Sequence, residues 1–206
     1  MISINSGSDS FRRLGILLHV GQSEYQAGYR AGSQMAARHL RRVLFVIHEA
    51  GNAALAQRCA GFRAALSRAG GRVGELTVDL QQPREAEQRI AAALATHRYD
   101  GLLTLGGASI AAPALDALRA THLLGKLTYA TFGIGPDVLR AVESGEITFA
   151  VDQQPYLQGY LPVVLLTQFH LYGVLPDRGR LVNTGPAFIT KENARRVLAL
   201  VGEGVR

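Results

Sequence analysis

The chain has few of the features that mark disulfide-bonded, metal-binding or membrane proteins. Its 206 residues include one cysteine, Cys59, which excludes an internal disulfide and any site built from several thiolates. No stretch reaches the roughly 18 uninterrupted apolar residues that a membrane span requires. The strongest candidate, around residues 163–166, is short and follows Gly159 and Pro162, and residues 1–7 show neither the charged region nor the long apolar region that an export signal has. We therefore expect no membrane insertion.

Positive charge is present but not concentrated. The net charge of +6 comes from 22 Lys and Arg against 16 Asp and Glu, and the only basic doublets are at residues 12–13, 41–42 and 195–196. A nucleic-acid partner would require the excess on one face, so we expect none for this chain. With 48% apolar and 18% charged residues, the composition indicates a packed globular protein and excludes a disordered one.

Catalytic motifs are missing as well. The six histidines show no metal-ligand spacing, and neither a Gly-x-Ser-x-Gly elbow nor a Gly-Lys-Ser/Thr loop occurs. Gly133 and Gly135 supply two of the three glycines of a dinucleotide fingerprint, but Pro136 stands where the backbone would approach a pyrophosphate. We expect no catalytic residue, no metal, no cofactor and no enzymatic activity; a small flavodoxin-like enzyme is the alternative.

Short apolar runs alternate with amphipathic stretches through most of the chain. This alternation predicts an α/β fold with a doubly wound parallel sheet flanked by helices, its first five strands in the order 2-1-3-4-5. The predicted strands are residues 43–47, 73–78, 101–105, 127–132 and 147–151, and the predicted helices are 53–69, 84–96, 108–121 and 136–143, with Ser109 near one helix start and His97 at one helix end.

Further elements flank this unit on both sides and suggest a second, incomplete layer. Strands at 2–5 and 16–20 lead into a helix at 24–40, which we expect Arg38, Arg41 and Arg42 to end. After the core come an apolar helix at 156–172, a strand at 180–184 and a last helix near 191–201. Two or three strands with one apolar helix do not make a closed sheet, so this layer would be a poor domain alone.

Polar residues or glycines follow most strands of the predicted sheet. They include Asn52, Gly106-Gly107, Gly133 and Asp152-Gln153. Because carboxyl ends of parallel strands share one edge, these groups converge there and suit a neutral polyhydroxylated ligand. Helix capping and turn formation are the alternative for each cluster, and a solvated position is the alternative for Arg58.

Three sequence runs resemble one known family. They are residues 20–28 (VGQSEYQAG), Gly51-Asn52 with Arg58 and Gly61-Phe62 downstream, and residues 149–160 (FAVDQQPYLQGY). Together they resemble the type I periplasmic sugar-binding proteins of ABC transporters, in the ribose-binding-protein-like superfamily. The resemblance implies two doubly wound lobes joined by three hinge strands, with a sugar held between them.

The resemblance also implies sites and boundaries. It assigns Asn5 and Ser6 to a sugar-contacting loop, Arg58 to a ligand-contacting arginine and Gln153 to the hinge, with Asn52 and Asp152 as neighbours. Gly106 or Gly107, and Gly133, stand where the family commonly has Asn and Asp. Residues 21–154 and 185–206 would form the C-terminal lobe, and 1–20 and 155–184 remnants of an N-terminal lobe that is mostly absent. We then expect the apolar helix at 156–172 to expose one face and the chain to self-associate.

The function that follows is the solute-binding component of a sugar importer, with a monosaccharide or a polyol such as inositol as ligand. Its partner would be the membrane permease of an ABC transporter, and its location the periplasm. The alternative is the effector-binding domain of a lactose-repressor-type transcription regulator, since the Gly-Phe pair after a helical arginine is shared with that class.

Overall fold

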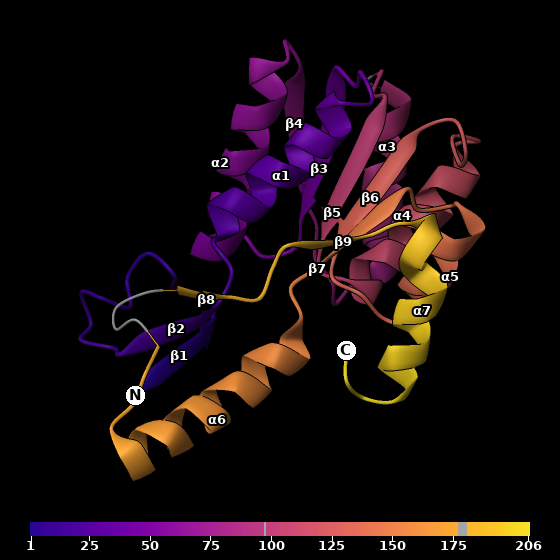
Figure 1. Ribbon diagram of the computed structural model, residues 1–206. Helices are drawn as coiled ribbons and strands as arrows, with labels where there is room; N and C mark the ends of the chain where they lie inside the picture. The colour runs from indigo at the N-terminus through magenta and orange to yellow at the C-terminus, as the bar shows by residue number, and fades with distance from the viewer. Residues whose placement is uncertain (97, 177–180) are drawn as a thin grey trace.

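The computed structural model describes residues 1–96, 98–176 and 181–206, and its larger part is built on one mainly parallel sheet (Figure 1). The strand order is β4-β3-β5-β6-β7-β9, so the predicted order 2-1-3-4-5 is confirmed for the first five strands. Strand β9 pairs antiparallel with β7 at the edge. The strands are β3 (Arg42–Ile47), β4 (Arg72–Thr77), β5 (Gly101–Leu105), β6 (Thr128–Phe132), β7 (Phe149–Asp152) and β9 (Ala187–Ile189).

Helices cover both faces of this sheet, as right-handed crossovers between parallel strands require (Figure 1). One face carries α1 and α2, whose side chains pack with Phe45 and Leu103; the other packs α3, α4, α5 and α7 around Leu44 and Leu102. Strand β5 is buried at every position because it lies inside the sheet between these two layers. The helices are α1 (Glu24–Ala36), α2 (Ala53–Arg68), α3 (Pro83–Thr96), α4 (Ala108–Ala120), α5 (Pro136–Ser144) and α7 (Lys191–Gly202).

Helices α1 and α2 pack backbone against backbone. A Cβ added at Gly28 of α1 would overlap the carbonyl of Arg58 in α2, and one at Gly61 of α2 would overlap the carbonyl of Tyr25. Glycine therefore permits a crossing that no larger residue would allow. The crossing brings the first turn of α1, with Glu24, next to Arg58.

A smaller unit stands beside the main sheet. Strands β1 (Ile2–Asn5), β2 (Leu18–Gly21) and β8 (Leu181–Asn183) form a three-stranded parallel sheet, and α6 (Pro155–Tyr172) packs on it. Figure 1 shows α6 extending away from the main sheet. Apolar side chains on this helix, such as Val163 at 65% exposure, face solvent, as expected from the sequence. In the described part of the chain, no helix combines the length and apolarity that membrane crossing demands.

Three segments of the chain connect the two units, and side-chain hydrogen bonds join two of these segments to each other. They are the passages from β2 to α1, from β7 to α6 and from β8 to β9. Thr184 Oγ1 donates to the carbonyl of Gln153 at 2.8 Å, and Gln158 Nε2 donates to the same carbonyl at 2.9 Å. Gln154, at a φ of +56°, donates from its side chain to the carbonyl of Thr184. The second and third passages therefore form one hydrogen-bonded junction.

Some local predictions were wrong. Helix α1 ends at Ala36 rather than residue 40, because the chain turns at His39, whose φ is +62°, and Arg38 donates back to the carbonyl of Gln34. The expectation that Ser109 lies near a helix start is confirmed, since α4 begins at Ala108 after the N-cap Gly107. Strand β9 was not predicted at all. The predicted helix end at His97 and strand start at Arg180 lie outside the described residues.

Candidate ligand-binding site

A cavity of about 370 Å³ lies at the carboxyl ends of the parallel strands, where the loop after β1 meets the main sheet. The strand ends, the first turns of α1 and α2 and the junction between the units contribute its walls. Its lining residues are Asn5, Ser6, Glu24, His48, Asn52, Ala54, Leu55, Arg58, Gly106, Gly107, Phe132, Gly133 and Gln153. Five of the six residues singled out in the sequence are therefore together around one space.

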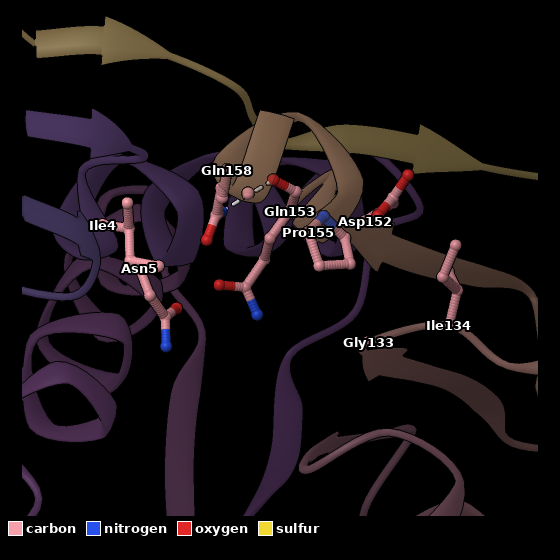
Figure 2. A pocket seen from close by; sticks show the side chains of 9 residues that line it. Ile4, Asn5, Gly133, Ile134, Asp152, Gln153, Pro155 and Gln158 are labelled. Carbon is pink, nitrogen blue, oxygen red and sulfur yellow. Dashed lines mark hydrogen bonds between the residues drawn. The ribbon is translucent and has the colours of Figure 1, made fainter. Parts of the chain in front are cut away.

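A second cavity of about 450 Å³ adjoins the first and shares Asn5, Gly133 and Gln153 with it. Figure 2 shows the side-chain amides of Asn5 and Gln153 extending into the same open space from the two units. Asn5 ends β1 with a φ of +65°, a conformation that asparagine adopts more readily than most residues. The two cavities form one cleft between the units.

Arg58 is buried in this cleft, so the alternative of a solvated helical arginine is wrong. Its side chain is 8% exposed, and its Nε donates to the carboxylate of Glu24. Its Nη2 donates to Gln153 Oε1 at 2.9 Å, and its guanidinium lies 4.9 Å from the centre of the Phe132 ring. Arg58 thus links α2 to α1 and to the junction between the units through one planar group.

Asn52 and Asp152 carry structural contacts. The Asn52 side chain accepts from the backbone N–H groups of Ala54 and Leu55, which makes it the N-cap of α2, and its Nδ2 donates to Glu49 at 2.9 Å. Asp152 is 1% exposed and accepts from Arg206 Nε at 2.7 Å and from the backbone N–H of Gln154 at 2.8 Å. Figure 2 shows its carboxylate turned away from the space that Asn5 and Gln153 face.

Glycines form the floor of the cavity. Gly106, Gly107 and Gly133 have φ values of +128°, +61° and +93°. A Cβ at Gly133 would come within 2.9 Å of the Gly107 Cα, and one at Gly106 would meet the His48 ring at 3.0 Å. This floor offers backbone and no polar side chain, so side-chain hydrogen bonds to a ligand come from the other walls.

Two polar cavity residues were missed in the sequence. Glu24 is 1% exposed. The helix dipole favours an acidic residue in the first turn of any helix, so the position of Glu24 in the sequence did not distinguish a binding residue from a helix-stabilising one. His48 follows β3, and the spacing of the six histidines does not distinguish it from the others. Its Nδ1 is buried without a partner among the described residues, as is Glu24 Oε1.

The charges in the cavity balance. Glu24 and Arg58 form an ion pair, and the remaining polar lining groups are amides, a hydroxyl and an imidazole. Such a set of directional donors and acceptors recognises a neutral molecule rich in hydroxyls better than a strongly charged one. Within the described ranges, no cluster of His, Cys, Asp and Glu could hold a metal ion.

The fold and the cleft at the strand ends define a two-part binding protein. Residues 1–170 match the model of the periplasmic binding protein domain, so the chain belongs to that family. The match confirms the family resemblance and the expectation that the chain is a binding protein and not an enzyme. No curated protein matches the chain significantly.

Solved structures are similar over all or nearly all of the chain. A carbohydrate transporter from Acidothermus cellulolyticus 11B in complex with myo-inositol matches with a TM-score of 0.89 and 31% identity, over 100% of this chain and 70% of its own. A glucose-galactose binding protein from Geobacillus stearothermophilus matches with a TM-score of 0.79 and 21% identity, over 93% of this chain and 68% of its own. An ABC transporter periplasmic solute binding protein from Actinobacillus succinogenes 130z, with bound D-allose, matches with a TM-score of 0.78 and 16% identity, over 95% of this chain and 69% of its own. The last two show the fold alone.

Proposed function

We propose that this chain is the solute-binding component of a sugar ABC importer, and that it binds a neutral monosaccharide or cyclitol in the cleft between its two units. The similarity to a carbohydrate transporter in complex with myo-inositol supports this class of ligand. So does the balanced charge of the cavity. Its location would then be the periplasm, and its protein partner a membrane permease.

The observation that carries the proposal is the placement of Arg58. A guanidinium has five N–H donors in a fixed fork, and the bonds to Glu24 and Gln153 use two of them. Because those bonds and the Phe132 ring hold its plane, the fork is already oriented at the cavity before a ligand arrives. A pre-oriented donor loses little side-chain entropy on binding, which favours affinity for hydroxyl oxygens.

The division of the chain into lobes is part of this proposal. Residues 21–154 and 185–206 would form one lobe, and residues 1–20 and 155–184 would belong to the other. Asn5 and Ser6 would contact the ligand from the smaller unit, and Arg58 and Gln153 from the larger unit and the junction. Asn52 and Asp152 would support these contacts through the helix cap and the Arg206 bond. The three connecting segments would act as the hinge on which the lobes close.

The test is a thermal-shift panel of myo-inositol, D-allose, D-glucose and D-galactose on the 206-residue chain. A ligand at 100 times its Kd stabilises the folded state by about 2.7 kcal/mol, which for a chain of this size raises the melting temperature by roughly 5–11 °C. We expect such a shift for at least one member and its loss in Arg58→Met. The control Arg119→Met removes an arginine that pairs with Asp116 and Glu146 far from the cleft and should keep the shift. An unchanged melting curve with every sugar would refute the proposal.

A further inference from the structure

Most polar side chains of the 370 Å³ cavity already have partners within the protein. Asn52 caps α2, and Gln153 Oε1 accepts from Arg58. The glycine floor contributes no side chain. A ligand with many hydroxyls also needs acceptors for its O–H protons, and the arginine fork supplies only donors.

Among the described residues, Glu24 and His48 both line the cavity and have a buried side-chain polar atom without a partner, and for Glu24 that atom is a carboxylate oxygen, which can only accept. Oε2 accepts from Arg58 Nε and from Gln22 Nε2, the latter at 3.2 Å, whereas Oε1 has no partner among the described residues. The residue is 1% exposed and lines the cavity, so bulk solvent hardly hydrates that oxygen. A buried carboxylate oxygen without a hydrogen bond is costly, which makes it a strong acceptor for a ligand donor.

The position of this oxygen is fixed by its surroundings. Glu24 is the first residue of α1, directly after the N-cap Ser23, and the glycine-mediated crossing with α2 holds that turn against Arg58. Rotation of the carboxylate would break the bonds to Arg58 and Gln22. Oε1 therefore keeps its position relative to the arginine fork, and both residues line the cavity.

We propose that Glu24 is a specificity-determining ligand contact: its Oε1 accepts the proton of one ligand hydroxyl while Arg58 donates to the oxygen of a neighbouring hydroxyl. This inference rests on the proposed function. The preferred ligand then carries vicinal hydroxyls, as sugars and cyclitols do. Because Arg58 already neutralises Glu24, an ammonium in place of the hydroxyl gains little attraction and meets the guanidinium charge.

His48 lies on the strand-end wall of the same cavity. Its ring packs against Gly106, where a Cβ would come within 3.0 Å of Nδ1, and Nδ1 has no partner in the described part of the chain. His48 is thus a second lining residue whose buried polar atom lacks a partner among the described residues, although buried polar atoms are ordinarily hydrogen-bonded.

The experiment is a calorimetric binding cycle on the 206-residue chain. The ligands are myo-inositol and D-allose, the single-position deoxy analogues of each, and the single-position keto analogues of myo-inositol. The proteins are the unmodified chain, Glu24→Gln and the control Glu85→Gln, which makes the same change in the first turn of α3 away from the cleft. Glu24→Asp, which keeps the charge beside Arg58 but shortens the reach, repeats the cycle if the glutamine variant does not fold.

We expect Glu24→Gln to change the affinity loss caused by removing one particular ligand hydroxyl and not the loss caused by removing the others. Removing the one hydroxyl that Glu24 accepts weakens binding to the unmodified chain by roughly 10- to 150-fold, the range for a hydrogen bond to a charged group. In Glu24→Gln the parent ligand weakens by a similar factor, and the same deoxy analogue loses nothing further. A keto group at that position binds better to Glu24→Gln than to the unmodified chain, because the amide N–H₂ now donates to it. Glu85→Gln behaves as the unmodified chain.

Two other outcomes separate the claims. If Glu24→Gln weakens the parent and every analogue by the same factor, Glu24 only positions Arg58 and this inference is overturned, while the proposed function stands. If the unmodified chain binds no member of either series, the proposed function fails and the inference falls with it.

Discussion

Replacing Arg58 with alanine tests whether the cleft is organised by one buried ion pair. The substitution leaves the Glu24 carboxylate, 2% exposed at its side chain, without its cationic partner, and it removes the donor to Gln153 and the contact with the Phe132 ring. Breaking a buried ion pair by removing one partner costs about 3–5 kcal/mol, most of it for the buried charge that remains. For a chain of this size we expect the melting temperature to fall by roughly 6–20 °C.

Arg119→Ala is the matched control. Arg119 forms two ion pairs, at 2.8 Å to Asp116 and 2.9 Å to Glu146, but its side chain is 49% exposed. Exposed pairs contribute about 0–1 kcal/mol each, so this variant should lose far less despite its larger number of partners. Urea unfolding followed by circular dichroism measures both free energies of unfolding. If Arg58→Ala costs no more than Arg119→Ala, the argument from burial is wrong.

Three further predictions concern packing, pH and association. Gly28→Ala should lower the free energy of unfolding by several kcal/mol, because the added Cβ overlaps the α2 backbone. Gly159→Ala is the control: it lies in helix α6, where an added Cβ meets no heavy atom within 4 Å, and it should raise the free energy of unfolding by about 0.4–1 kcal/mol. Equal effects of the two substitutions would refute the close crossing. Burial lowers the pKa of His19 below its ordinary 6.5, so the unfolded chain takes up the proton first. The free energy of unfolding should therefore fall as pH drops below about 6.5, and His19 should contribute at most ~1.4 kcal/mol per pH unit to this slope. His19→Gln should remove that contribution, and an unchanged slope in this variant would contradict the prediction. Tyr156 and Tyr160 are 40% and 52% exposed, and their ring centres lie 5.8 Å apart in a stacked arrangement. We expect the chain to self-associate in sedimentation experiments, and the double variant Tyr156→Ser/Tyr160→Ser to associate less. If the unsubstituted chain sediments as a monomer at every concentration, this prediction is wrong.

The main sheet could be predicted because buried parallel strands and amphipathic helices leave regular patterns. The observed β5 has the predicted bounds, Gly101–Leu105, and α2 differs from its prediction by one residue. The edge strand β9 could not be predicted, since its three residues show no periodicity and its antiparallel partner, β7, lies far upstream. The end of α1 was misjudged because Arg41 and Arg42 suggested a cationic last turn, but they follow the helix.

The candidate site was predictable where it depends on strand-end topology or on the family resemblance, which supplied Asn5, Ser6 and Arg58. Residues at strand ends converge by topology, which is why Asn52 and Gln153 could be placed near one edge before any coordinates. The pairing of Glu24 with Arg58 joins residues 34 positions apart through a helix crossing, and no periodicity reports such a contact. The same applies to Asp152, whose partner Arg206 lies 54 positions away.

Calorimetric titration of the 206-residue chain with myo-inositol measures ligand binding in the cleft without an indirect readout. We expect saturable binding of one molecule per chain, which Arg58→Met abolishes and Arg119→Met preserves. Heats of dilution alone, with myo-inositol and likewise with D-allose, D-glucose and D-galactose, would contradict it.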